Sequence, residues 1–533
     1  MNALKALPPV AHGWSALLAR DDTRWVDGVL HLVHDDLTPE QAHIADLIAV
    51  ADALASAGID PLLVRHHRTP VIVVDAADAP VAWRALQGLA HREPLYVKTR
   101  GVAPRLLADL APPADVVSGE AVSALRLFRP RVSVGGSRRY GIAGAVRLEF
   151  WRSSDGLVHA PQATALTRRV FAADDLVEAS VRRYGRSWRT IAGMFDPQPD
   201  EVTADIDMVF SWVDGSSTRF QKQRAAQLEE YVVGAGDDGP ARFRHVDELR
   251  YALRSVHMYA PWVRRIFIAT DSDRPAWLAE HPRVTFVRSA EFFADPTVLP
   301  THNSHAVEAQ LHRIEGLAEN FLYSNDDMFF GRPVTPELFF TSGGITKFVE
   351  CDVRIGSGPT RLERSGHDNA LRVNRALLHE RFGRTILRDL EHCATPLRRS
   401  VLSELEREFA TDFARTAGSR FRAATDISVT NSLYHYYALM TGRAVATTEP
   451  RVRYVQTTMA SSLRDLDRLE RRDDIDMFCL NDGGEVEVPE ELRVKLLRET
   501  LERLFPIRAP WERDVVSAAP AAGESADRRD AGH

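Results

Sequence analysis

The sequence has little of what would place it in a specialised class of proteins. Its 533 residues include only three cysteines, Cys351, Cys393 and Cys479, which are far apart and odd in number. This spacing predicts neither a disulfide framework nor a zinc site, and it fits a reducing compartment. No apolar run is long enough to span a membrane, and the start lacks the apolar segment of a signal peptide. We therefore expect a soluble, cytoplasmic protein.

The sequence also lacks a strong excess of positive or negative charge. The 67 Lys and Arg residues almost balance the 74 Asp and Glu residues, which leaves a net charge of −7. A protein with this balance is not expected to bind nucleic acid in general, although local basic pockets for phosphate groups stay open. What is present is ordinary for globular proteins, with 44% hydrophobic and 26% charged residues in a chain long enough for two or three domains.

Residues 1–200 predict an N-terminal accessory domain of α/β type. The run from Thr38 to Gln41 has the pattern of a capping box at a helix start, and Gly58 marks the helix end. No motif in this region carries chemistry, so we expect it to support, regulate or target the rest of the chain. Its other predicted elements are a helix around 81–89 and strands at 71–74, 146–150 and 170–171.

Two polar segments suggest where the domains end. The proline-broken stretch Asp196–Asp205 separates the N-terminal domain from a catalytic domain expected over residues 205–512. Residues 515–533 are of low complexity and rich in Ala, so they predict a disordered tail.

Three adjacent polar residues, Asn325, Asp326 and Asp327, interrupt an apolar run over residues 321–330 that predicts buried strand. Two buried carboxylates side by side are costly to desolvate and repel each other. A divalent cation, or a cluster of Arg and Lys, between them and a ligand would relieve both effects. The alternative is a strand end with exposed acids.

An earlier strand also ends in polar residues. Residues 206–211 predict a buried strand that delivers Trp212 and Asp214 into a turn at Gly215. In open α/β sheets the ligand lies beyond the C-terminal ends of the strands, so a nucleotide is expected here. The motif by itself is not specific, because strand–Asp–Gly turns are common.

Arg250 and Arg254 lie four residues apart on a predicted helix, which has Leu249, Leu253 and Val256 on its buried face. Two arginines on one face could hold a phosphate group bidentately. A solvated basic stripe is the alternative, and the spacing leaves both open.

A further helix is predicted to begin at Asn303 or Ser304 and to run through Ile314 into the strand that carries the acids. Asn303 or Ser304 could simply cap this helix. Glu308, one turn further along, could face the same cavity as Asp326 and Asp327.

Arg420 and Arg422 bracket Phe421 and precede Asp426. If this segment is extended, one guanidinium points outward and the other inward. His392 lies upstream in a separate segment, and a lone histidine is more often structural than catalytic.

Together these segments resemble the stealth proteins, which are bacterial capsular polysaccharide hexose-1-phosphate transferases related to the lysosomal-enzyme N-acetylglucosamine-1-phosphotransferase of animals. The resemblance covers roughly residues 205–510 and leaves the N-terminal 200 residues outside it. It is carried by Ile-Asp-Met-Val-Phe-Ser-Trp-Val-Asp-Gly (206–215), Asp-Glu-Leu-Arg-Tyr-Ala-Leu-Arg-Ser (247–255), Asn-Ser-His-Ala-Val-Glu (303–308), Tyr-Ser-Asn-Asp-Asp-Met-Phe-Phe (323–330), Ser-Arg-Phe-Arg (419–422) and Phe-Cys-Leu-Asn-Asp (478–482).

The resemblance implies a glycosyltransferase-A-like α/β core with helical insertions that binds a UDP-hexose or UDP-N-acetylhexosamine. Sugar 1-phosphate would pass to a hydroxyl of an acceptor glycan, with a phosphodiester formed and UMP released. Asp326 and Asp327 would hold Mg²⁺ (or Mn²⁺), and His392 would be the general base for the acceptor hydroxyl.

The resemblance also implies roles for the other candidate residues. Arg420 and Arg422 would bind the diphosphate. The residues expected to be catalytic are Asp214, Asp327, His392 and Arg420. Those expected to bind substrate are Trp212, Gly215, Arg250, Arg254, Asn303, Ser304, Glu308, Asn325, Arg422, Asp426 and Asn481.

Two other functions are compatible with the same residues. An ordinary metal-dependent glycosyltransferase would attack the anomeric carbon and release UDP, and it needs the same metal, diphosphate site and acceptor base. A non-catalytic glycan-binding protein would be expected to have lost acidic and basic positions that remain in this sequence. In either case the protein could associate peripherally with the inner face of the membrane.

Overall fold

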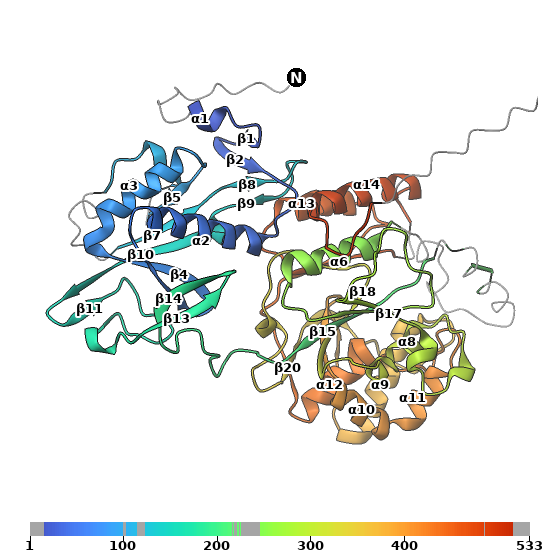
Figure 1. Cartoon of the computed structure of the whole chain (residues 1–533). Coiled ribbons are helices and arrows are strands. Elements are labelled where there is room, and N and C mark those ends of the chain that lie inside the picture. Colours follow the sequence, from blue (N-terminus) through green and yellow to red (C-terminus); the bar gives the residue numbers. More distant parts are fainter. Residues whose placement is uncertain are drawn as a thin grey trace, which may run out of the picture.

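The structure, a computed structural model, describes residues 15–99, 103–113, 123–215, 217, 221, 222, 224, 246–483 and 486–514. The chain before and after about position 200 forms two bodies that lie side by side (Figure 1). Each body has buried hydrophobic clusters of its own. The tail predicted at 515–533 lies outside the described residues.

The N-terminal body is built around a mixed sheet in the order β13-β14-β3-β4-β10-β7-β5-β6, with β11 and β12 attached to β10. A smaller sheet has the order β1-β2-β8-β9. The strands are β1 (Thr23–Val26), β2 (Val29–Val33), β3 (Leu62–His66), β4 (Thr69–Asp75), β5 (Tyr96–Lys98), β6 (Arg105–Leu106), β7 (Ser123–Phe128), β8 (Arg131–Val132), β9 (Arg139–Tyr140), β10 (Val146–Ser154), β11 (Leu157–His159), β12 (Val170–Ala172), β13 (Glu178–Arg183) and β14 (Arg186–Ile191). The helices are α1 (Ser15–Leu18), α2 (Pro39–Ser56) and α3 (Ala79–Ala90).

The helix start predicted at Thr38 is confirmed. The Thr38 hydroxyl accepts the Gln41 N–H, and the Gln41 side chain accepts the Thr38 N–H, which completes the capping box of α2. Gly58 has a φ of +80°, a left-handed conformation that suits glycine just beyond a helix end. Leu47 and Leu54 on the buried face of α2 pack in one cluster with α3 and the sheet.

The second body contains the predicted α/β core. Its sheet has the order β17-β16-β15-β18-β23, in which the first four strands run parallel and β23 is antiparallel. The strands are β15 (Ile206–Ser211), β16 (Ile266–Ala269), β17 (Val284–Val287), β18 (Asn320–Asn325) and β23 (Thr395–Arg398).

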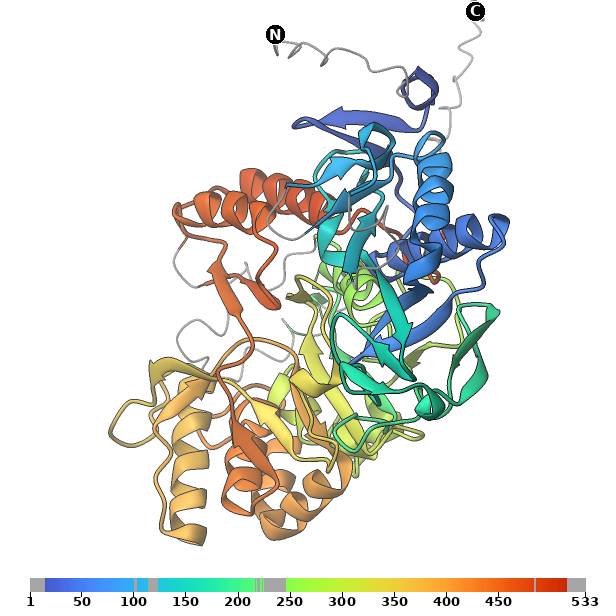
Figure 2. The same cartoon turned by 90° about the vertical axis from the view of Figure 1, so that its left-hand side faces the viewer.

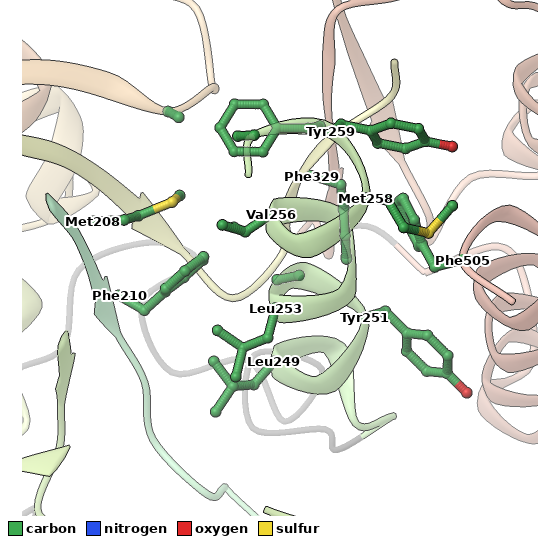
Figure 3. Packing of buried hydrophobic residues seen from close by; sticks show 14 of the residues in the cluster. Met208, Phe210, Leu249, Tyr251, Leu253, Val256, Met258, Tyr259, Phe329 and Phe505 are labelled. Carbon is green, nitrogen blue, oxygen red and sulfur yellow. The ribbon is translucent and has the colours of Figure 1, made fainter. Parts of the chain in front are cut away.

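Helices cover both faces of this sheet, as a parallel sheet requires. Because side chains alternate along a strand, Met208 and Phe210 of β15 point to one hydrophobic cluster and Val209 to the other. Figure 3 shows Met208 and Phe210 on the side of α6 that carries Leu249, Leu253 and Val256. The helices of this body are α6 (Glu248–Tyr259), α7 (Ser289–Phe292), α8 (Ser304–Glu308), α9 (Gly366–Phe382), α10 (Arg399–Glu408), α11 (Ala410–Ala417), α12 (Tyr434–Met440), α13 (Ser462–Arg471) and α14 (Glu490–Leu504).

A second sheet begins where the first one ends. Strand β18 stops at Asn325, and after a turn β19 (Met328–Phe330) pairs with β26 (Met477–Asn481) and not with the core sheet. Strand β25 (Val452–Gln456) completes this sheet. Two separate two-stranded sheets complete this body. One pairs β20 (Thr346–Phe348) with β24 (Ala444–Ala446), and the other pairs β21 (Glu350–Arg354) with β22 (Arg388–Leu390).

The helix predicted from Asn303 through Ile314 is shorter than expected. Helix α8 ends at Glu308, and a separate 3₁₀ turn follows at Leu311–Arg313. Between them the buried amide of Gln310 accepts the Ala294 N–H, a tertiary contact that no helical pattern reveals.

Arg138 joins the two bodies. Its guanidinium donates to the carbonyl of Gly331, which follows β19, and to the carbonyl of Leu504. Leu504 is the last residue of α14, where helix carbonyls lack partners within the helix. The same guanidinium lies 5.7 Å from the ring centroid of Tyr259 in α6. Figure 2 shows α9 and its neighbours (gold to orange) at the end away from the N-terminal body. None of the helices in the described ranges combines the length and apolar character needed to cross a membrane.

An ion pair buried inside the second body ties α6 to the C-terminal segment. Arg254 donates to both carboxylate oxygens of Glu512 at 2.8 and 2.9 Å and to the Phe505 carbonyl. The side chains of Arg254 and Glu512 are 2% and 0% exposed. Glu512 also accepts from Arg250 at 2.7 Å, so without Arg254 its carboxylate keeps one cationic partner, while the Phe505 carbonyl loses this donor.

We therefore expect Arg254→Met to lower the free energy of unfolding by about 1.5–3 kcal/mol, measured by urea denaturation. The matched control is Arg471→Met, which breaks an ion pair with Asp467 in which the arginine is 76% exposed. That change is expected to lower stability by less than about 1 kcal/mol. Equal losses in the two variants would contradict the structural role of Arg254.

Candidate active site

Two cavities open near the C-terminal ends of the parallel strands. The larger, which we call the carboxylate pocket, has a volume of about 390 Å³ and lies where β18 passes into β19. The smaller, the strand-end pocket, has a volume of about 80 Å³ and follows β15 and β16. The predicted residues that line the carboxylate pocket are Ser304, Glu308, Asn325, Asp327, His392, Arg422 and Asn481.

Asp327 lies in the turn between the two sheets. Its backbone carbonyl accepts the Leu480 N–H, and its Oδ2 accepts the Cys479 thiol at 3.5 Å. Its buried Oδ1 has no hydrogen-bond partner among the described residues. Burial raises the pKa of Asp327 to about 6, and the carboxylates of Glu248 and Asp482 act in the same direction. A charged Asp327 is therefore unfavourable unless a cation approaches it.

This arrangement fits a magnesium ion that is held jointly with substrate. In the described residues no group of three or more His, Cys, Asp or Glu side chains is placed to hold a metal by itself. Mg²⁺ is commonly bound through one or two carboxylates, with substrate phosphates and water filling the other positions. Asp327 supplies such a carboxylate, and Asp326 precedes it in the same turn outside the pocket lining.

Of the two arginines, Arg422 reaches the carboxylate pocket and Arg420 does not. Arg422 donates to the Ser304 hydroxyl at 2.8 Å and lines the cavity. Arg420 is exposed outside that lining, and its backbone carbonyl accepts the His302 N–H. One guanidinium points outward and the other inward, as predicted, but not because of strand alternation, which would place residues 420 and 422 on the same face. The chain bends at residues 420 and 421, and the inward arginine is Arg422, which had been expected only to bind substrate.

Asn303 and Asp426 lie behind the pocket wall and do not line it. Asn303 caps α8 through its Oδ1 and donates from Nδ2 to Asp426 Oδ2 at 2.8 Å. The same carboxylate oxygen accepts the Ala423 N–H. These bonds hold the loop that carries Arg422, so direct substrate binding by Asn303 or Asp426 does not fit the structure.

Glu308 is buried at the pocket wall, 2% exposed. It accepts hydrogen bonds from the hydroxyls of Tyr323 and Thr430 at 3.1 and 2.7 Å. Burial raises the pKa of Glu308, although these two hydroxyls and Arg422 act in the opposite direction. The position that the sequence predicted, in one cavity with Asp327, is the position found.

His392 faces the pocket with its ring 5.2 Å from that of Tyr454. Burial lowers the pKa of His392, the charge of His367 lowers it further, and Asp389 acts in the opposite direction. An imidazole that is uncharged near neutral pH can accept a proton.

Ten further residues line the pocket without having been among the site residues predicted from the sequence. Those with a titratable side chain are His305, His367, Asp389, Glu391, Tyr454 and Asp482. Asp482 lies in the family block at residues 478–482, so the sequence offered a signal for it. His367 and Asp389 lie in separate elements, α9 and β22, and no local pattern connects them.

The strand-end pocket contains only part of the motif predicted at residues 212–215, because Asp214 and Gly215 do not line it. Trp212 is buried and lines it, together with Thr270 and Asp271 at the end of β16. Asp214 and Gly215 follow in the turn, and the Asp214 N–H donates to the Ser272 hydroxyl at 2.8 Å. The two strand ends thus meet at one edge of the sheet, where a nucleotide was expected.

Arg250 and Arg254 have a different role from the one expected. Both donate to Glu512, and Arg254 is buried within the core. Neither lines the carboxylate pocket or the strand-end pocket. Because an internal carboxylate already occupies these guanidinium groups, a diphosphate role does not fit.

Curated proteins from several actinobacteria are similar to this chain over most of its length. The exopolysaccharide phosphotransferase CpsY of Mycobacterium tuberculosis (strain H37Rv) is 51% identical over 490 residues, which cover 91% of each chain. The exopolysaccharide phosphotransferase of Nocardia farcinica is 52% identical over 488 residues, 92% of this chain and 91% of that protein. Such coverage includes most of residues 1–200, so the N-terminal body is shared with these relatives although the motifs lie outside it.

Solved structures give a weaker similarity. A crystal structure of the galactosyltransferase LgtC with donor and acceptor sugar analogues aligns with a TM-score of 0.28 at 12% identity, over 56% of this chain and 96% of that one. A crystal structure of an active-site mutant of LgtC gives a TM-score of 0.29 at 10% identity, over 55% of this chain and 95% of that one. Because these scores are low, the architecture of the core is argued from its strand order and not from the alignments.

Three segments match conserved regions of the stealth proteins. Residues 242–348 match conserved region 2, residues 391–439 match conserved region 3, and residues 467–521 match conserved region 4. These segments contain Asp327, His392 with Arg422, and Asn481, which the fold brings to one pocket. With these regions and relatives of more than 50% identity, the resemblance noted from the motifs is confirmed, and the chain belongs to the stealth family of phosphotransferases.

Proposed function

We propose that this protein transfers hexose 1-phosphate, or N-acetylhexosamine 1-phosphate, from a UDP-sugar to a hydroxyl of an acceptor glycan. A phosphodiester forms and UMP leaves, as a step in capsular or exopolysaccharide synthesis. The names of the relatives support the phosphotransfer to a polysaccharide. The observation that carries the proposal is one pocket lined by Asp327, Arg422 and His392, where the buried Oδ1 of Asp327 has no hydrogen-bond partner among the described residues.

The donor is assigned to the two neighbouring cavities. The nucleoside would occupy the strand-end pocket beside Trp212, and the diphosphate would extend toward Arg422 and Ser304 in the carboxylate pocket. Asp327, with Asp326, would hold Mg²⁺ (or Mn²⁺). When bound, the ion would neutralise charge on the diphosphate.

The chemistry at phosphorus requires positive charge more than a covalent nucleophile. Attack on the β-phosphorus places negative charge on the phosphoryl oxygens, which Arg422 can stabilise through charge-assisted hydrogen bonds. His392, uncharged and open to the pocket, would take the proton of the acceptor hydroxyl. Glu308 and Asn325 on the wall would orient the sugar through hydrogen bonds.

The N-terminal residues 1–200 are proposed as a separately folding accessory domain without a part in the chemical step. Their contacts with the second body include Arg138, which donates to the carbonyls of Gly331 and Leu504, and neither residue lines the pocket. The active protein is expected in the cytoplasm, with peripheral association at the inner face of the membrane and no nucleic-acid partner.

The leaving group identifies the reaction. Incubation with UDP-sugars, Mg²⁺ and acceptor glycan is expected to release UMP, and the ³¹P spectrum of the product is expected to show a phosphodiester. Release of UDP with a phosphorus-free product would instead establish an ordinary glycosyltransferase that attacks the anomeric carbon.

Asp327→Asn is expected to abolish turnover because it removes the charge that attracts the cation. Its thermal stability is expected to be unchanged or slightly raised. The pKa of Asp327 is raised in the folded state, so ionisation near neutral pH opposes folding, and the amide relieves that effect. The control is Asp467→Asn on the surface of α13, which should leave both quantities unchanged. Full activity of Asp327→Asn, or of the wild-type protein in EDTA, would remove the metal from the proposal.

Arg422 and Arg420 provide a matched pair of variants in one loop. Arg422→Ala is expected to raise the KM for the UDP-sugar and to lower kcat by about 10²–10³-fold, because the diphosphate is charged in the ground state and gains charge in the transition state. Arg420→Ala, at an exposed position, is expected to change either constant less than about twofold. Steady-state kinetics of both variants test the assignment, and a larger effect at Arg420 would reverse it.

A further inference from the structure

His367 and Asp389 form a pair inside the carboxylate pocket that the reaction described so far does not use. His367 Nε2 and Asp389 Oδ2 are 2.7 Å apart. The carboxylate is 8% exposed, and its other oxygen accepts the Leu390 N–H at 2.8 Å. With both oxygens engaged, Asp389 fixes the orientation of the ring and leaves Nδ1 of His367 as the nitrogen available to a ligand.

Three imidazoles line the pocket, those of His305, His367 and His392. Burial by itself would raise the pKa of Asp389, but the His367 ring outweighs it and holds that pKa below its usual value. The His392 ring lies 6.4 Å from that of His367, and burial together with the His367 charge disfavours its own charged form.

Other charged groups also line the pocket. Glu308 reaches it from α8 and Arg422 from the loop after α11, and the remaining acids are Asp327, Glu391 and Asp482. Burial raises the pKa of Glu308, with His367 acting in the opposite direction. Burial also raises the pKa of Glu391.

We propose that His367, oriented by Asp389, is a catalytic residue that donates a hydrogen bond from a charged imidazolium to the transferred phosphoryl group. Asp389 is its positioning residue. This inference rests on the proposed function and adds a second cationic contact beside Arg422.

The phosphoryl transfer needs no proton from His367. The acceptor oxygen bonds to the β-phosphorus, and the bond from that phosphorus to the bridging oxygen breaks. The electron pair leaves on UMP, and the acceptor proton passes to His392. His367 keeps its proton throughout, and its hydrogen bond strengthens as charge develops on the phosphoryl oxygens.

The test compares His367→Gln, Asp389→Asn and the control His312→Gln. His312 also pairs with a carboxylate, that of Glu406 at 2.9 Å, but it lies outside the pocket lining. His367→Gln is expected to lower kcat by about 10²–10³-fold. Asp389→Asn keeps the shape and is expected to lower kcat less than His367→Gln does, and His312→Gln is expected to leave kcat unchanged.

Calorimetry with UDP and uridine supplies a readout besides activity. His367→Gln is expected to bind UDP in Mg²⁺ about tenfold more weakly, by loss of one charge-assisted contact, with uridine affinity unchanged. An unchanged kcat in a folded His367→Gln, or equal loss of UDP and uridine affinity, overturns the inference, while UMP release by the wild-type protein leaves the proposed function standing. Release of UDP by the wild-type protein would instead overturn the proposed function itself.

Discussion

The passage of the chain from one sheet to another at Asn325–Asp327 determines the rest of the site. Strand β18 is held on both sides by the core sheet, while β19 begins three residues later with a different partner, β26. A backbone hydrogen bond from Leu480 to the Asp327 carbonyl secures the turn. The acids therefore lie at a junction that neither sheet fills, and the pocket exists because both sheets end there.

The same junction brings distant parts of the sequence together. Pairing of β19 with β26 places Asn481 and Asp482 beside Asp327, more than 150 residues earlier in the chain. From the opposite wall, α8 contributes Ser304 and Glu308, and the loop fastened by Asn303 and Asp426 contributes Arg422. The residues behind the wall matter as much as those on it, because they fix where the guanidinium points.

Charged side chains in this protein serve two distinct purposes, and their partners decide which. Arg254 is buried against Glu512 and completes the packing of α6 against the C-terminal segment. Arg422 donates to the hydroxyl of Ser304 and faces a cavity, so its charge can act on a ligand there. A buried pair and a guanidinium at a cavity look alike in sequence, since both are arginines near apolar residues.

Local sequence determined the elements and the type of chemistry. Capping at Thr38, the apolar strands 206–211 and 266–269, and the buried face of α6 follow from short-range preferences that the fold preserves. The family blocks pointed to Asp327 and Glu308, and the resemblance as a whole implied a role for His392; these three residues share one pocket.

Tertiary structure alone decided which of the similar residues face that pocket. It turned Arg422 inward and Arg420 outward, used Arg250 and Arg254 for an internal ion pair, and joined His367 to Asp389 across two elements. Each of these outcomes depends on contacts between residues far apart in the chain, which periodicity and local motifs do not encode.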